Sequence, residues 1–459
     1  MKQQCTFSRN LTSHRAVLVC LSFVAMLGLT PVVSAEPPKA IPATEFLDSI
    51  GINSTFPDRG EPLDKTIGML KYGGFHWVRG GIEGLTDSGP TTLQTYLDMH
   101  QQTGVRFSWG LGSGSSNLPK LLATSKTIAA AGALLAFEGN NEPNNWGITY
   151  NGEVGAGKNG ATWLPVAKIL RDLYKSVKGD PDLAKYPVWS ISENGAENDN
   201  VGLQFLTIPA GAKALMPDGT QFADAANVHN YIYHPKAPDP ADNKTWNASD
   251  PGPGCKVDGL YGNYGHTWYK KFKGYSVAEL QTLPRVTTET GTTIGAKITE
   301  EMQALNTLSM YLDQFKRGFS YTSPYILSDR TDESGNQSYG LFKKDYTPRK
   351  AAVYLHNFTA ILADSGKVAT AGQLDYTIAH EPVTVHDMLL QHSDGAFQLI
   401  VWDERLKGTD KVTVSFGAPH AAVTIYDPTI GTDAVKTYNH VSSLDLVLSN
   451  HPLILTIPN

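Results

Sequence analysis

Cysteine is scarce in this sequence, which has three in 459 residues. Cys5 and Cys20 lie in an N-terminal segment that we expect to be removed, leaving Cys255 in the mature chain. A single cysteine cannot form an internal disulfide, so packing must stabilise the fold. No histidine lies close to Cys255 in the sequence, and we expect a bystander thiol rather than a nucleophile.

A strong excess of charge is also lacking. Charged residues make up 18% of the chain, and the formal net charge is -6 at pH 7. A nucleic-acid partner would require a basic face, so we expect none, and a neutral or weakly charged substrate fits better. The histidines His229, His234 and His266 match no metal-binding spacing, and we expect neither a metal nor another cofactor.

A long apolar run occurs at the N-terminus and nowhere else. Basic residues precede an apolar stretch from Ala16 to Leu29, and Val33-Ser34-Ala35 offers small residues at the cleavage positions. This pattern predicts a signal peptide over residues 1–35, with Glu36 as the first mature residue. The alternative, an uncleaved membrane anchor, would need a longer run. We therefore expect a secreted or periplasmic protein without stable membrane insertion after cleavage.

After a leader over residues 36–43, strand-type and helix-type runs alternate. Such alternation over residues 44–365 predicts an α/β fold, a (β/α)₈ TIM barrel. An open doubly wound sheet would need fewer strands and a Gly-rich first turn, which is absent. The strand-type runs are Ser49–Asn53, His76–Gly80, Val105–Leu111, Leu134–Asn140, Val188–Glu193, Asn227–Tyr233, Arg285–Glu289 and Phe319–Ile326.

The pattern changes at about Gly366. Two apolar runs flank Ser393-Asp394-Gly395, a hairpin turn, and later apolar residues alternate with polar ones. We predict a small β-sandwich domain over residues 366–459, with a strand from the mature N-terminus as one candidate to complete it. Packing against the barrel is its expected role, and sugar binding is the alternative.

Two glutamates close strand-type runs. Glu142 follows the fourth run, and Glu289 ends the seventh. Barrel strands present their C-terminal ends to one site, so the two carboxyls can converge as a protonated acid and an ionised nucleophile about 5–5.5 Å apart. Pro143 should restrict Glu142 to an extended backbone. The rivals are Glu138, expected to be a buried hydrogen-bonded partner, and Glu193, expected to have a binding or structural role.

The segment Phe137-Glu138-Gly139-Asn140-Asn141-Glu142-Pro143-Asn144 resembles the acid/base motif of clan A glycoside hydrolases, and is most similar to that of family 39 and its relatives. The resemblance implies that Glu142 is the acid/base, that Asn141 contacts a sugar 2-hydroxyl, and that Glu289 is the nucleophile. It further implies that Arg79 supports Glu289, and that His229 and Tyr231 are partners of that carboxylate. One departure is that the eighth strand offers tyrosines where the clan often has tryptophan.

We therefore predict a retaining β-glycoside hydrolase acting on a carbohydrate through a glycosyl-enzyme intermediate. Trp146 and Tyr321 join Asn141, Arg79, His229 and Tyr231 as the predicted substrate-binding residues, because sugar rings stack on aromatic side chains. Two alternatives remain open: a transglycosylase using the same two glutamates, and an inactive barrel that binds polysaccharide.

Overall fold

The computed structural model describes residues 36–54, 56, 61–156, 162–192, 202–232, 274–330, 338–405 and 408–459. The predicted signal peptide, Glu193, Cys255, His234 and His266 lie outside these residues, so the expectations for them stay predictions.

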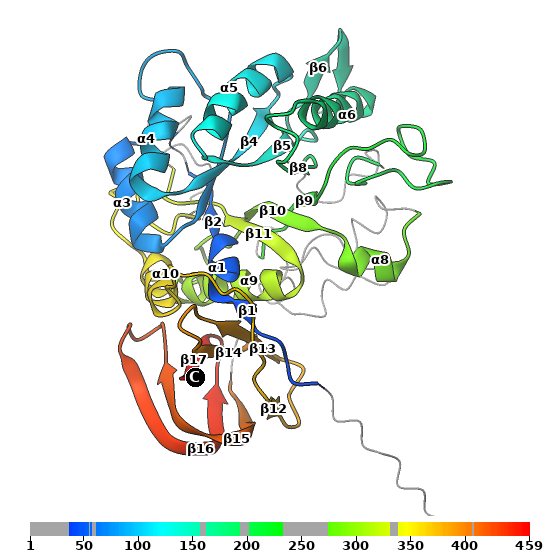
Figure 1. Cartoon of the computed structure of the whole chain (residues 1–459). Coiled ribbons are helices and arrows are strands. Elements are labelled where there is room, and N and C mark those ends of the chain that lie inside the picture. Colours follow the sequence, from blue (N-terminus) through cyan, green and yellow to red (C-terminus); the bar gives the residue numbers. More distant parts are fainter. Residues whose placement is uncertain are drawn as a thin grey trace, which may run out of the picture. The chain divides into compact units, whose positions relative to one another are not determined.

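All eight predicted barrel strands occur, in the predicted order (Figure 1). Five of them form one parallel sheet and three form another. Parallel bridges between Ile50 and Thr322, and between Trp189 and Ala225, join the two sheets and close the barrel. In chain order the strands are β2 (Gly51–Ile52), β3 (Trp77–Gly81), β4 (Arg106–Ser113), β5 (Leu134–Asn141), β8 (Val188–Trp189), β9 (Ala226–His229), β10 (Arg285–Thr290) and β11 (Phe319–Pro324).

Helices follow the strands as the apolar spacing predicts. In α6 (Leu164–Gly179), Val166, Ile169, Leu170 and Val177 recur at helical spacing and are fully buried. No helix in the described part of the chain is long and apolar enough to span a bilayer. The others are α1 (Ala43–Asp48), α3 (Leu63–Gly73), α4 (Leu93–Thr103), α5 (Leu118–Ala130), α8 (Val277–Thr282), α9 (Glu300–Lys316) and α10 (Lys350–Ile361), and strands β6 (Ile148–Tyr150) and β7 (Glu153–Gly155) form a hairpin after β5.

Side chains inside the barrel change from apolar to polar along strands β3 and β10. On β3, Trp77 belongs to an apolar cluster, and Arg79, two residues later, binds carboxylates. Val286 and Thr288 repeat this change on β10. Because alternate residues of a strand share a face, the polar groups gather at the C-terminal ends of the strands. This end of the barrel therefore holds the candidate site.

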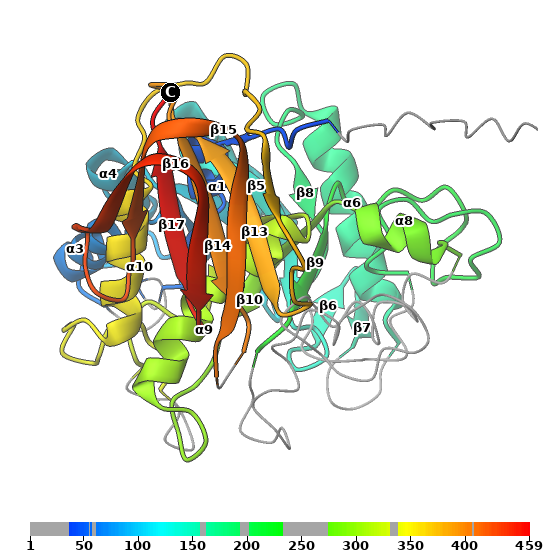
Figure 2. The ribbon, with the colours of Figure 1, turned by 90° about the horizontal axis from the view of Figure 1, so that it is seen from below.

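The C-terminal region, for which we predicted a β-sandwich, is an antiparallel β-sheet region. It is one connected sheet in the order β1-β13-β14-β17-β15-β12, with β16 paired to β15. Strands β13, β14 and β17 lie side by side in both ribbon views (Figures 1 and 2). The strands are β12 (Tyr376–Ile378), β13 (Val385–Gln391), β14 (Phe397–Asp403), β15 (Asp410–Tyr426), β16 (Ala434–Leu448) and β17 (Pro452–Ile457).

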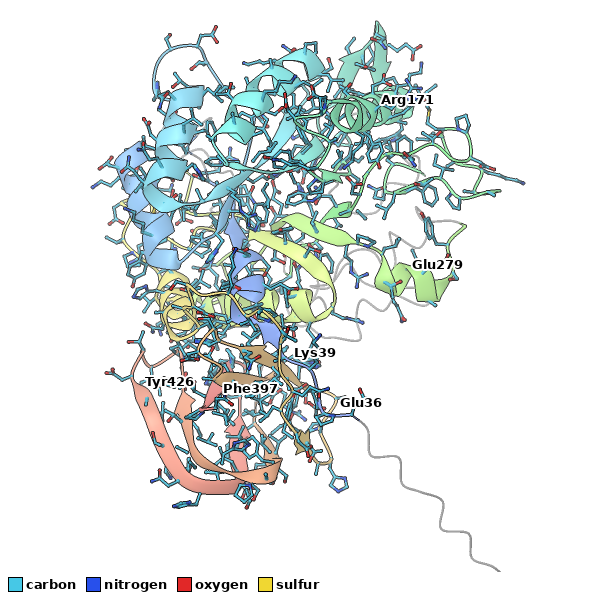
Figure 3. All side chains as sticks on the ribbon, in the orientation of Figure 1. Glu36, Lys39, Arg171, Glu279, Phe397 and Tyr426 are labelled. Atoms are coloured by element: carbon cyan, nitrogen blue, oxygen red, sulfur yellow. The ribbon has the colours of Figure 1, made fainter. Side chains whose placement is uncertain are left out.

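Strand β1 (Ile41–Pro42), from the predicted leader, pairs in parallel with β13 and supplies the expected N-terminal strand. Hairpin β15–β16 has a register shift between Ser415 and His420. Its apolar side chains pack with those of β13, β14 and β17 in one cluster, so the expected sandwich core is built by a single sheet. Phe397 and Tyr426 mark this region in Figure 3.

The other face of the sheet contacts the barrel helices. Met388, Ile400 and Trp402 belong to the same apolar cluster as the buried residues of α9. Trp402 donates its indole N–H to the buried Asp313 of α9 at 2.7 Å. These contacts support a packing role for the C-terminal sheet.

Candidate active site

Glu142 follows the last residue of β5, and its backbone is held on both sides. Its N–H donates to the carbonyl of Ser192 at 3.0 Å, and its carbonyl accepts from Asn145 and Trp146 at 2.8 and 2.9 Å. The expected extended backbone is wrong, because Glu142 has φ 37°, in the left-handed region. The hydrogen bonds from the following turn outweigh the preference that Pro143 imposes. Strain of this kind gathers at functional sites, where the surrounding structure maintains it.

Glu289 points into the barrel because β10 is irregular. Thr288 and Glu289 are consecutive, yet both contact residues of the barrel interior: Thr288 donates to Glu138, and Glu289 accepts from Arg79. In a regular strand, neighbouring side chains face opposite ways. The register against β9 shifts between Thr287 and Glu289, and such a bulge re-aims a side chain.

Glu142 and Glu289 do converge. One carboxylate oxygen of each lies within 4.8 Å of the other, and each side chain is 13% exposed. Arg79 binds Glu289 through Nη1 at 2.9 Å. Tyr231 donates its hydroxyl to the other oxygen of Glu289 at 2.8 Å. The predicted partners Arg79 and Tyr231 therefore hold this carboxylate from two sides.

Glu138 is the buried hydrogen-bonded partner that we expected. It is 1% exposed and binds Arg79 through both oxygens, at 2.5 and 3.1 Å. Thr288 and Asn227 also donate to it, at 2.9 and 3.3 Å. Burial alone would lower the pKa of Arg79, but the carboxylates of Glu138 and Glu289 outweigh burial and raise that pKa above its usual range. Arg79 therefore carries a fixed positive charge.

His229, the last residue of β9, lies between the two glutamates. Its Nδ1 is 2.8 Å from Oε1 of Glu142 and 3.3 Å from Oε2 of Glu289, and its side chain is fully buried. Its Nε2 is 3.3 Å from the hydroxyl of Thr288. The resemblance implied that His229 is a partner of Glu289. His229 contacts both glutamates, and its shorter contact is to Glu142.

The two glutamates differ in how their pKa values shift. Burial tends to raise the pKa of Glu142, but the hydrogen bond and charge of His229, aided by Asn145, outweigh burial and lower it. Burial also raises the pKa of Glu289. Together with the negative charge of Glu142, burial outweighs the lowering effects of His229 and Arg79, so the pKa of Glu289 is raised. Without substrate, these directions are opposite to those expected for an acid at Glu142 and a nucleophile at Glu289.

Asn141 and Trp146 flank Glu142 in different ways. The side-chain carbonyl of Asn141 accepts from Arg79 at 2.9 Å, and its amide donates to Ser113 at 3.0 Å, so its orientation is fixed. Trp146 is 54% exposed and is bonded to the Glu142 carbonyl through its backbone. An exposed indole four residues after the candidate acid is available for stacking.

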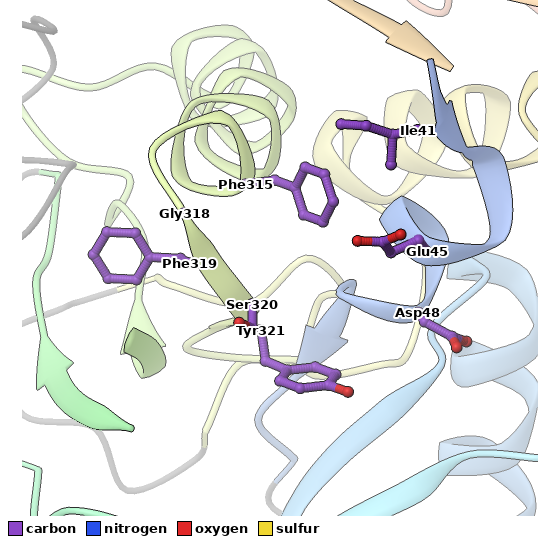
Figure 4. A pocket seen from close by; sticks show the side chains of 8 residues that line it. All are labelled: Ile41, Glu45, Asp48, Phe315, Gly318, Phe319, Ser320 and Tyr321. Carbon is purple, nitrogen blue, oxygen red and sulfur yellow. The ribbon is translucent and has the colours of Figure 1, made fainter. Parts of the chain in front are cut away.

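Tyr321 does not lie in this site. Its ring packs against Trp77 and Trp189 at 5.9 and 5.4 Å, deep in the barrel. It also lines a hollow of about 390 Å³ beside α1 and Phe315, at the N-terminal ends of the strands (Figure 4). The prediction that Tyr321 contacts substrate is therefore wrong, since it lies too early on β11.

Tyr325 and Tyr339 lie beside the predicted Tyr231, at the C-terminal ends of the strands. Tyr325 follows β11, and its ring lies 5.5 Å from that of Tyr339, which in turn lies 5.6 Å from that of Tyr231. Arg330 donates to the Tyr325 hydroxyl at 2.6 Å. Even spacing from Tyr321 to Tyr325 was the available signal, because residues four apart on a strand share a face at different depths.

One group in the described residues could ligate a cation. Glu142, His229 and Glu289 each offer one atom, and the three atoms lie within 4.8 Å of one another. The positive charge of Arg79 lies 2.9 Å from Glu289 and opposes a metal ion there.

No protein-family model and no curated protein matches the chain by sequence. Solved structures do resemble it. A family 39 glycoside hydrolase from the gut symbiont Bacteroides cellulosilyticus WH2 matches with a TM-score of 0.58 and 14% identity, covering 92% of this chain and 83% of that one. The family 30 subfamily 8 xylanase Xyn30A from Clostridium acetobutylicum matches with a TM-score of 0.52 and 10% identity, covering 89% and 95%.

CelM2, a bifunctional glucanase-xylanase protein from a metagenome library, matches with a TM-score of 0.50 and 12% identity, covering 89% of this chain and 98% of that one. At such identities the likeness establishes the fold alone. This chain therefore has the fold of these solved glycoside hydrolases.

Proposed function

We propose that the protein is a secreted or periplasmic retaining β-glycoside hydrolase. The observation that carries this proposal is the convergence of Glu142 and Glu289, whose nearest oxygens lie within 4.8 Å, at the C-terminal ends of β5 and β10. Retaining enzymes have their two carboxyls about 5–5.5 Å apart, whereas inverting enzymes need about 6.5–9.5 Å to admit a water molecule. The short separation supports retention.

In the proposed reaction, Glu142 gives its proton to the glycosidic oxygen as the bond from that oxygen to the anomeric carbon breaks. Glu289 attacks the anomeric carbon and forms an ester with the sugar, and the aglycone leaves as an alcohol. Arg79 and Tyr231, at 2.9 and 2.8 Å, aim Glu289 and stabilise its anion. Glu142 then takes a proton from water, whose oxygen attacks the same carbon and releases Glu289.

The raised pKa of Glu289, caused by burial and then by the Glu142 charge, has a consequence for this scheme. Glu142 must hold the proton when substrate is bound, although its own pKa is lowered against burial by His229. The assignment of roles therefore rests on strand position and on the motif. It also requires a source for the proton of Glu142.

The test is a panel of β-linked polysaccharides and aryl β-glycosides, incubated with wild type, Glu142→Gln and Glu289→Gln. Loss of a general acid or a nucleophile should lower turnover by at least about 10²-fold. Glu45→Gln is the control, because Glu45 is exposed beside the hollow at the opposite end of the barrel. Near wild-type turnover in either active-site variant would remove that residue from its role.

Product analysis separates the alternatives. Proton NMR of the first-formed sugar should show the β-anomer, and an α-anomer would indicate inversion. Products longer than the substrate would indicate a transglycosylase. Saturable binding of a polysaccharide without turnover of any substrate would indicate an inactive binding barrel.

A further inference from the structure

His229 is placed to do more than orient a carboxylate. Both of its ring nitrogens have close partners, and the side chain is fully buried. The hydrogen that each nitrogen carries can be assigned from those partners, because each donor must meet an acceptor.

The assignment begins at Thr288, whose hydroxyl has a single hydrogen. Its acceptors are Oε1 of Glu138 at 2.9 Å and the side-chain carbonyl of Asn227 at 3.1 Å. The carboxylate is both nearer and charged, so the hydrogen goes to Glu138. Asn227 also receives the backbone N–H of Thr288, at 3.2 Å. The Thr288 hydroxyl oxygen accepts from the side-chain amide of Asn227 at 3.0 Å, and its second lone pair faces Nε2 of His229 at 3.3 Å, so Nε2 carries a hydrogen.

With Nε2 protonated, Nδ1 allows two arrangements. A neutral ring has a lone pair at Nδ1, which faces the oxygen of Glu142 at 2.8 Å, so Glu142 must carry the hydrogen between them. A charged ring carries that hydrogen itself and faces two carboxylates. Either way, one proton lies between Oε1 of Glu142 and Nδ1 of His229.

We propose that Glu142 and His229 form an acid dyad that stores the proton for the departing alcohol. The inference rests on the proposed glycosidase function and supplies the proton that Glu142 requires. His229 acts through Glu142 and is a positioning residue. Glu142 and Glu289 are charged groups in contact with His229. Arg79 and Tyr231 act through Glu289, and Glu138 acts through Thr288.

The dyad gives up one proton in the first step of the reaction and regains one proton in the second. In the first, the shared proton moves through Glu142 to the leaving oxygen, which leaves an anionic Glu142 and a neutral His229 protonated at Nε2. In the second, Glu142 takes a proton from the attacking water, and the dyad regains its starting state.

The first test needs no substrate. The wild-type protein, labelled with ¹⁵N-histidine, is titrated by NMR, and the His229 signals are identified by their absence from His229→Gln. We expect Nε2 to remain protonated throughout, while Nδ1 moves between protonated and unprotonated shifts. A ring protonated at Nδ1 and bare at Nε2 at neutral pH would overturn the dyad.

The second test uses aryl β-glycosides of one sugar whose phenols differ in acidity. His229→Gln should lose at least about 10-fold more turnover with the poor leaving groups than with the good ones, because good leaving groups need no acid. It should also shift the alkaline limb of the pH profile. Tyr231→Phe is the control, since Tyr231 touches Glu289 and should lower turnover equally for all leaving groups.

An equal loss across the series in His229→Gln would overturn the dyad. If the wild type cleaved no β-glycoside, the proposed function would fall, and the NMR titration would still decide where the proton lies.

Discussion

The two ends of the barrel interior differ in chemistry: aromatic rings fill the N-terminal end, and charged side chains gather at the C-terminal end. At the N-terminal end, the rings of Trp77, Trp189 and Tyr321 pack against one another with centroids 5.4 to 5.9 Å apart. At the C-terminal end, Arg79 and the imidazole of His229 serve three carboxylates. On β3 the interior side chains change from aromatic to charged within two residues, from Trp77 to Arg79.

The difference teaches where stability and chemistry reside in this fold. Aromatic rings packed without water gain free energy from burial and from ring contacts. Buried charges cost desolvation energy, which their partners only partly return. The apolar end therefore offsets the cost of gathering charges at the other end, and variants at the two ends should affect different properties.

Trp189→Ala should give the largest change in stability. The indole is 1% exposed and contacts two other rings, and truncation of such a residue costs about 3–5 kcal/mol. The free energy of unfolding, measured by urea denaturation, should fall by this amount. Trp146→Ala is the matched control, because Trp146 is 54% exposed and its loss should change stability by no more than about 0.5 kcal/mol. Equal losses in the two variants would contradict the contrast between the ends.

Glu289→Gln should stabilise the protein at neutral pH while it removes activity. Burial, with the Glu142 charge, raises the pKa of Glu289 in the folded state, so the folded chain keeps this proton to a higher pH than the unfolded chain. Stability therefore falls as the pH rises from the ordinary glutamate pKa to the raised one. The melting temperature of the variant should exceed that of wild type above this window, and the difference should vanish below it.

A structural carboxylate that follows β15 of the C-terminal sheet should behave in the opposite way. Burial tends to raise the pKa of Asp427, but His451 and Thr429 outweigh it and lower that pKa. The stability it provides is present above the ordinary aspartate pKa and is lost as the pH falls through the lowered one. Asp427→Asn should thus lower the melting temperature at neutral pH. If both Glu289→Gln and Asp427→Asn raised the melting temperature at neutral pH, the opposite pKa shifts of the two carboxylates would not explain their effects on stability.

The sequence predicted the fold well because periodicity carries that information. Eight apolar runs of strand length alternate with helical spacing, and each run became a barrel strand. It also predicted that Glu142 and Glu289 would converge, because strand ends meet at one edge of a barrel. The alternation on β5 likewise identified Glu138 as a buried partner.

Departures from regular geometry explain what the sequence could not predict. A bulge turns Glu289 inward beside Thr288, and hydrogen bonds from Asn145 and Trp146 hold Glu142 at a positive φ. Both effects depend on contacts between segments that local propensity does not encode. The depth of a side chain along its strand was the third feature that the sequence could not predict. The alternation gives the face on which Tyr321 lies, but not whether it lies near the N-terminal or the C-terminal end of the barrel.

The smallest effect is expected from variants that test the depth of the tyrosines along β11. Tyr321 lies on β11 and Tyr325 follows that strand, and their ring contacts place them at opposite ends of the interior. Tyr321→Phe should leave kcat/KM within about twofold of wild type, since the lost hydroxyl is far from the carboxylates. Tyr325→Phe removes the acceptor of Arg330 next to the Tyr339–Tyr231 rings, and loss of one such hydrogen bond, about 1 kcal/mol, corresponds to about fivefold in kcat/KM. If Tyr321→Phe had the larger effect, the aromatic end of the barrel would take part in catalysis, and the division between the two ends would be wrong.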